Sequence, residues 1–166
     1  MVDHYAVSAT SQGYDAAPMH DGMPEEIQGL FTDEELAEIA ENKPEPGDNG
    51  KPDALGLSRA WALHVEKLDQ DRVLPHTDRS VWTEHDLAGA LFMRDFVEDA
   101  LGRLRPGLAG KVRRYVTAGD DLFRSFTADD PGDRIAKIAR IDLTGRGWWW
   151  FRVPTSGPIV QDLAKY

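Results

Sequence analysis

Two long amphipathic stretches, separated by a short break, constrain the fold of this chain more than any other feature of its sequence. Apolar residues recur at steps of three and four from residue 84 to about 104 and again from 108 to 126, which is the period of an α-helix. Arg105, Pro106 and Gly107 stand between the two stretches, and a proline followed by a glycine interrupts the first helix. Because long helices joined by so short a connection are antiparallel neighbours, we expect an αα-hairpin.

Capping patterns predict further helices, and with them a mainly α fold that packs as an antiparallel helical bundle. Thr32 with Glu35, and Thr83 with Asp86, have the spacing of a capping box at a helix start. Ser58 is the expected N-cap of another helix. The additional helices are expected over about 33–42, 59–69, 131–139 and 159–165. Residues expected on apolar helix faces include Trp61, Leu63, His64, Val65 and Leu68, and Phe96 in the first hairpin helix.

A glycine-rich connection near the C-terminus predicts a short β-hairpin. Residues 144–147, Thr-Gly-Arg-Gly, lie between 140–143 and 148–153, two runs of β-branched and aromatic residues. Side chains alternate along a strand, so the four consecutive aromatics of the second run would divide between the two faces of the hairpin. We expect the helices to cover one face of this hairpin, and either the C-terminal tail and loops or a protein partner to cover the other face. The expected partner-binding residues are Trp148, Trp149, Trp150, Phe151 and Arg152.

The negative charge of the chain is concentrated near its N-terminus. Of the net charge of −10, residues 1–54 carry 13 acidic and two basic residues, whereas residues 55–166 carry 16 acidic and 17 basic ones. The segment 43–53 contains three prolines and two glycines, which end regular structure. We therefore expect a helical domain at residues 53–166, preceded by an acidic arm at residues 1–52. The arm is expected to be flexible and largely disordered, with one short helix and little contribution to the core.

Charge and composition also exclude several classes of function. An acidic segment repels nucleic acid and anionic lipid, and it favours a basic protein partner or serves solubility. The lack of cysteine excludes disulfides, thiolate metal sites and a cysteine nucleophile. The five histidines do not have the spacing of metal ligands. Without a signal sequence or an apolar run of roughly 20 residues, we expect a cytoplasmic protein with no membrane span, no metal and no cofactor.

The leading hypothesis is a non-enzymatic protein-binding protein, of an accessory, regulatory or immunity-like kind, that uses the acidic arm and the aromatic hairpin. The alternative is a small enzyme or ligand-binding domain with a groove beside the second hairpin helix and the tryptophans. Its candidate catalytic residues are Asp120, Asp121, Arg124 and His85. Asp120 and Arg124 are four residues apart and are expected to pair on the helix surface, with Asp120 at the edge of the apolar stripe.

Overall fold

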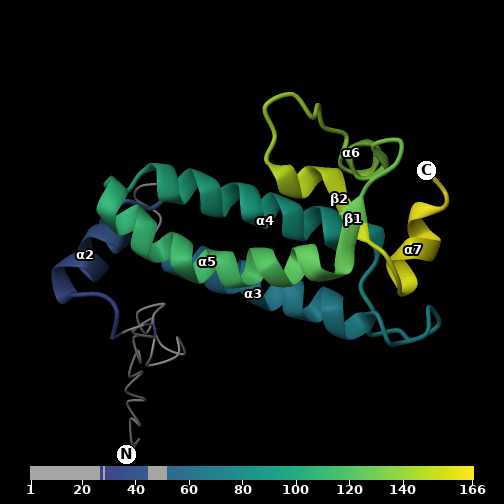
Figure 1. The fold of residues 1–166 in the computed structure, drawn as a ribbon, viewed down its shortest axis with the longest axis horizontal. Helices are drawn as coiled ribbons and strands as arrows, with labels where there is room; N and C mark the ends of the chain where they lie inside the picture. The colour runs from purple at the N-terminus through teal and green to yellow at the C-terminus, as the bar shows by residue number, and fades with distance from the viewer. Residues whose placement is uncertain (1–26, 28, 45–51) are drawn as a thin grey trace, which may run out of the picture.

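Three long helices form the framework of the fold: α3 (Ala54–Asp71), α4 (Glu84–Gly102) and α5 (Pro106–Phe126). The computed structural model describes residues 27, 29–44 and 52–166, and this part of the chain contains six helices and a two-stranded antiparallel sheet. Figure 1 shows α4 and α5 running antiparallel from their junction, with α3 alongside both. The predicted αα-hairpin and the mainly α bundle are therefore confirmed.

The predicted capping box of α4, Thr83 with Asp86, is present. Helix α3, in contrast, begins earlier than the sequence predicted. Its N-cap is Asp53, whose carboxylate accepts the backbone N–H of Gly56 at 3.0 Å. The predicted cap, Ser58, lies inside the helix, where its buried hydroxyl donates to the carbonyl of Ala54 at 2.6 Å. The first turn also buries Leu55, so the additional helical residues remove apolar surface from water, which favours the earlier start.

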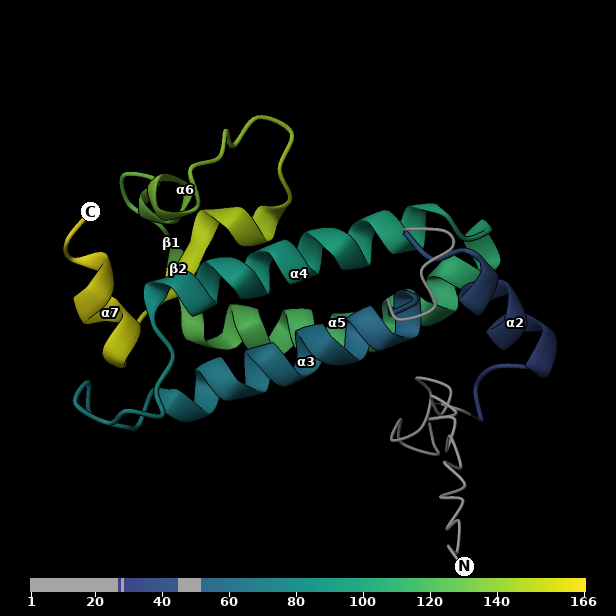
Figure 2. The ribbon, with the colours of Figure 1, turned by 180° about the vertical axis from the view of Figure 1, so that it is seen from behind.

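Helix α2 (Asp33–Glu41) lies at the end of the bundle where α4 and α5 join (Figure 2). It starts with the predicted capping box: the Glu35 backbone N–H donates to the Thr32 hydroxyl at 3.1 Å, and the Thr32 N–H donates to the Glu35 carboxylate at 3.0 Å. Ile39 is completely buried and Phe31 nearly so, both within the main hydrophobic core. The expectation that residues 1–52 contribute little to the core is wrong for this helix.

Ion pairs from Arg105 and Lys111 attach α2 to the helical hairpin. Lys111 donates to both carboxylate oxygens of Glu35 at 2.8 and 2.9 Å, and Arg105 donates to Glu38 at 3.0 Å. The hydrogen bond from Lys111 lowers the pKa of Glu35 below its ordinary value. Part of the acidic charge of the arm is thus neutralised by the chain itself. The disorder expected for the remainder of the arm concerns residues 1–26 and 45–51, which lie outside the described residues.

The two-stranded sheet is formed by different segments from those of the predicted hairpin. Strand β1 (Thr127–Asp129) follows α5 directly and pairs antiparallel with β2 (Arg152–Pro154). Residues 140–147 form no strand, and the 3₁₀-helical turn η1 (Trp148–Phe151) precedes β2. The predicted pairing of 140–143 with 148–153 is therefore wrong. Strand β1 offers β2 a backbone partner that is distant in sequence, and Trp149 and Trp150 are buried in the 3₁₀ turn instead of lying in an extended strand.

Two short helices complete the described chain. Helix α6 (Arg134–Ala139) begins later than Pro131, because Gly132 and Asp133 have positive φ, which a right-handed helix excludes. The buried Asp130 carboxylate accepts the backbone N–H of Ile135 in its first turn at 2.8 Å. Helix α7 (Pro158–Leu163) confirms the predicted C-terminal helix and buries Leu163. None of the described helices is long and apolar enough to span a membrane.

The buried stripe of α4 contains the charged residue Arg94 and leaves out Phe96, which was expected on the apolar face. Phe96 is about half exposed, and so is Leu63 on α3; the assignment of both to the core is wrong. On α4, Phe96 falls between the buried positions 94 and 97 and points away from both. On α3, Leu63 follows the buried Trp61 by two residues, which places Leu63 on the opposite side of the helix. Position 94 is occupied by an arginine, which is buried.

Candidate functional site

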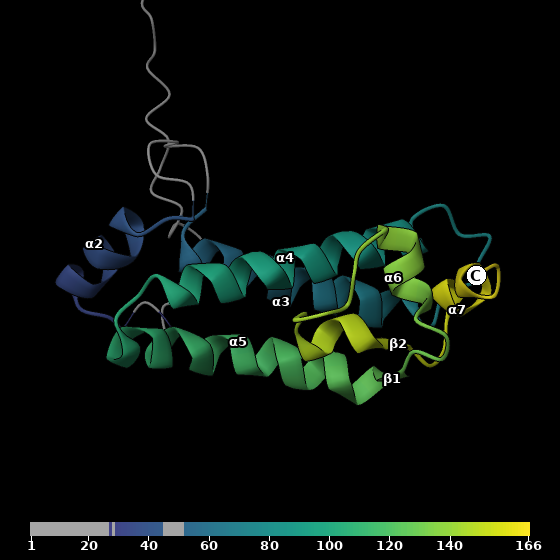
Figure 3. The ribbon, with the colours of Figure 1, turned by 90° about the horizontal axis from the view of Figure 1, so that it is seen from above.

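The turn η1 packs against α4 and α6, and its ribbon lies between α4 and α5 in Figure 3. Trp150 is completely buried and meets Phe92 of α4 edge to face at 4.8 Å between ring centroids. The ring of Trp148 lies 6.1 Å from that of Phe123 on α5. The aromatic turn is thus a structural link between the arms of the hairpin.

Asp95 on α4 fixes the position of this turn. One carboxylate oxygen, Oδ1, accepts the indole N–H of Trp149 at 2.8 Å and that of Trp150 at 2.9 Å. The other oxygen accepts a hydrogen bond from Arg146 at 2.9 Å. Gly147 is required beside it, since a Cβ atom at that position would lie 2.2 Å from the ring of Trp149. Residues 145–147 therefore accommodate an indole ring and are not the turn of a hairpin.

A second network lies beneath the turn and is organised by the buried Arg94. Its guanidinium binds Asp120 of α5 through two hydrogen bonds of 2.9 and 3.0 Å, and Asp120 also accepts the indole N–H of Trp61 at 2.9 Å. A third guanidinium nitrogen donates to Glu98 at 2.9 Å. The guanidinium lies 4.2 Å from the ring centroid of Trp149, a cation–π contact. All three long helices and the aromatic turn meet at this arginine.

The charges of this network stabilise one another. Burial by itself lowers the pKa of Arg94, but hydrogen bonds and charge from Asp120 and then Glu98 raise it above its ordinary value. Burial by itself raises the pKa of Glu98, but hydrogen bonds from Arg113 and Arg94 lower it below its ordinary value. Both groups therefore remain charged at neutral pH.

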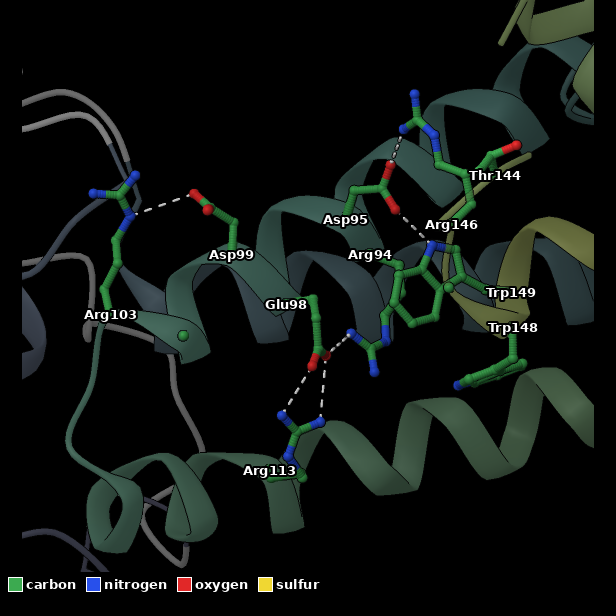
Figure 4. Close-up of a pocket in the computed structure, with 13 residues that line it drawn as sticks. Arg94, Asp95, Glu98, Asp99, Arg103, Arg113, Thr144, Arg146, Trp148 and Trp149 are labelled. Carbon is green, nitrogen blue, oxygen red and sulfur yellow. Dashed lines mark hydrogen bonds and ion pairs between the residues drawn. The ribbon is translucent and has the colours of Figure 1, made fainter. Parts of the chain in front are cut away.

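An open groove of about 1020 Å³ lies over these networks, between α4 and the segment 144–149 (Figure 4). Its charged lining consists of Arg94, Asp95, Glu98, Asp99, Arg103, Arg113 and Arg146. A smaller hollow of about 360 Å³ is lined by Arg124, Asp129, Trp148, Phe151 and Arg152. We refer to these two as the large and the small hollow. Trp148 lines both, so its ring forms a wall that they share.

Trp149 and Trp150 do not lie on opposite faces, as the strand hypothesis required. Both are buried and both donate to the same oxygen of Asp95. The predicted alternation is wrong because these residues form a 3₁₀ turn, in which successive side chains do not alternate. Trp148 and Arg152 are partly buried and Phe151 is 41% exposed, so three of the five predicted partner-binding residues are accessible.

The four candidate catalytic residues do not converge on one site. Asp120 does not pair with Arg124 on the helix surface, because it is buried and bound to Arg94. Arg124 instead lies 3.6 Å from Asp121 and stacks on Trp148 at 3.7 Å from its ring centroid. His85 is exposed in the first turn of α4.

Sequence reasoning missed the residues that organise the site, above all Arg94 and Asp95. An arginine in register with the buried positions of α4 was an available signal, since a charge in an apolar stripe demands a buried partner. Comparison with protein-family models gives no match, and neither does comparison with curated proteins or with solved structures.

Proposed function

We propose that this chain is a non-enzymatic, cytoplasmic protein that binds a protein partner, and that the partner contacts Trp148 and Phe151 where the two hollows meet. The observation that carries this proposal is the position of Trp148 as the shared wall of both hollows, with Arg124 stacked on its ring at 3.7 Å. Tryptophan and arginine are the residue types most enriched in binding hot spots.

The surface around Trp148 is held in place before any partner arrives. Its ring contacts Phe123 at 6.1 Å, Trp149 at 5.8 Å and the guanidinium of Arg124. Asp95 in turn fixes Trp149 through its indole N–H. A side chain that is already ordered loses little conformational entropy on binding, which favours its use as an anchor.

Arg94 and Glu98, two charged groups that line the large hollow, favour binding over acid–base catalysis. A general acid or base works best with a pKa near the operating pH. Here the pKa of Glu98 is lowered and that of Arg94 is raised, so both move away from neutrality. Their mutual ion pairs support a stable surface more readily than proton transfer.

The test is a comparison of partners retained by the parent chain and by a Phe151→Ala, Trp148→Ala double variant. Each chain is immobilised, exposed to extract of its source cells, and the retained proteins are quantified by mass spectrometry. We expect at least one protein to be retained by the parent and lost by the variant, and its purified form to bind the parent directly.

The matched control is Leu63→Ala, which removes a large exposed apolar side chain on α3 that lies outside both hollows. It should retain the same partner as the parent. Retention by the double variant equal to that by the control, or no partner that binds the purified parent, would contradict the proposal.

A further inference from the structure

A third hollow, of about 270 Å³, lies between α3 and α5 and shares no lining residue with the large or the small hollow. The two helices run in the same direction along the bundle (Figure 2). Leu63 is a large apolar side chain that is 50% exposed here. The lining consists of Arg59, Ala62, Leu63 and Glu66 from α3, and of Tyr115, Ala118, Gly119 and Leu122 from α5. We refer to this hollow as the α3–α5 groove.

The lining residues of α3 are arranged symmetrically along the helix. Arg59 and Glu66 lie equally far from the midpoint between Ala62 and Leu63, and their spacing is about two helical turns, so they share one face. A two-fold axis at this midpoint places a second copy of α3 antiparallel to the first. Arg59 of each copy then lies opposite Glu66 of the other, and Leu63 lies opposite Ala62.

The lining residues of α5 have the same symmetry at the same level of the bundle. The midpoint between Tyr115 and Leu122 falls between Ala118 and Gly119. Gly119 lies beside the midpoint on α3, because a Cβ atom at Gly119 would be 3.6 Å from the Cα atom of Ala62. A single two-fold axis across both helices therefore serves both sets of residues, with α3 packed on α3 and α5 packed on α5.

The charges at the two ends of the set on α3 have opposite signs and are available for pairing. Neither Arg59 nor Glu66 makes an ion pair with another residue in the described part of the chain. In the antiparallel arrangement each arginine meets the glutamate of the other copy, so two ion pairs form across the axis. A parallel arrangement would place like charges opposite one another, which opposes association.

The net charge of the chain is located away from this groove. Residues 1–54 carry 13 acidic and two basic residues, whereas residues 55–166, which include the whole lining of the groove, carry 16 acidic and 17 basic ones. At physiological ionic strength, exposed charges more than about 8 Å apart are largely screened from one another. The two faces that meet are therefore close to neutral, and repulsion between whole chains is weak at their contact.

From this symmetry we infer that the α3–α5 groove is a self-association surface and that its occupant is a second copy of this chain. Leu63 of each copy packs over Ala62 of the other, and Arg59 pairs with Glu66 on both sides of the axis. Burial of Leu63 and the partly exposed Tyr115 removes apolar surface from water and stabilises the dimer. The groove is separate from the surface around Trp148, so this inference and the proposed function can fail independently.

Sedimentation velocity of the full chain measures the association. Two helices present a modest face, which supports a micromolar dimer, so the chain is followed from about 5 to 500 μM. We expect the sedimentation coefficient to rise with concentration from that of a monomer to that of a dimer. Leu63→Glu should weaken association about tenfold or more, because each copy then places a carboxylate in an apolar contact. The matched control is Val73→Glu, the same kind of change at an 87% exposed position outside the groove, and it should keep the affinity within about twofold.

A charge-swap experiment tests the antiparallel arrangement itself. Arg59→Glu places two glutamates of one copy opposite two of the other, and Glu66→Arg does the same with arginines, so each variant alone should associate about tenfold more weakly than the parent. In an equimolar mixture, one copy of each variant restores both opposite-charge pairs. We therefore expect the mixture to recover most of the parent affinity. Far-ultraviolet circular dichroism checks that each variant keeps the helical fold.

Three outcomes would overturn the inference. The first is a parent chain that stays monomeric over the whole concentration range, which excludes a second copy as the occupant. The second is equal weakening by Leu63→Glu and Val73→Glu, which places the contact elsewhere. The third is a mixture of the two charge variants that associates no more tightly than either alone, which rejects the pairing of Arg59 with Glu66.

Discussion

Replacement of Asp95 by alanine should release the aromatic turn from α4. The Asp95 carboxylate is the acceptor for the indole N–H groups of both Trp149 and Trp150, and it also binds Arg146. In the alanine variant both indole donors lose this acceptor in a buried environment. The turn η1 connects to the small hollow through Trp148, so stability and binding should fall together.

The expected magnitude follows from the two donors. A buried donor without a partner costs about 1–3 kcal/mol. The Asp95 side chain is 23% exposed, which lets water reach part of the vacated space, so we expect a total near the lower end, about 2–3 kcal/mol. For a chain of this size that corresponds to a decrease in melting temperature of roughly 5–10 °C.

The measurement is urea denaturation followed by tryptophan fluorescence and by far-ultraviolet circular dichroism, with Asp99→Ala as the matched control. Asp99 lies one turn further along α4, its side chain is 56% exposed, and it makes a single 3.4 Å contact with Arg103. Both variants gain the same helix propensity, so the difference isolates the buried hydrogen bonds. If Asp95→Ala destabilises the protein no more than Asp99→Ala, Asp95 does not anchor the turn and our account of the site is refuted.

Three further predictions concern the same region. Gly147→Ala should displace the Trp149 ring and lower the melting temperature, since the new Cβ would lie 2.2 Å from that ring. The control Gly102→Ala has open space around its Cβ and should leave the melting temperature unchanged. Thermal denaturation compares the two variants. Trp149→Ala and Trp150→Ala should both destabilise the fold, by roughly 3–5 kcal/mol each, and a mild effect of either would contradict its burial. The folded-state pKa of Glu98 is lowered, so its contribution to stability is present above the ordinary pKa of 4.5 and is lost as pH falls through the folded-state pKa. In acid unfolding, the stability of a Glu98→Gln variant should therefore decline less steeply with falling pH than that of the parent.

The helices could be predicted from the sequence because their signals are local. The apolar steps of three and four in α4 and α5, the break at Pro106 and the capping boxes at Thr32 and Thr83 each involve residues within a few positions of one another. Backbone preference and one-sided hydrophobicity act over that same range, so the pattern and its cause coincide. The αα-hairpin and the helical fold class follow from them.

The site was decided by contacts that no local spacing encodes. Arg94 and Asp120 are 26 residues apart, and Asp95 is separated from Trp149 and Trp150 by 54 and 55 residues. The four aromatics look like a strand because their intrinsic preference is extended, yet burial against α4 and hydrogen bonds to a distant carboxylate outweigh that preference. Residue types alone indicated that this segment matters. Which of its side chains are buried and which stay exposed depended on the space between two packed helices, and that space exists only once the tertiary structure has formed.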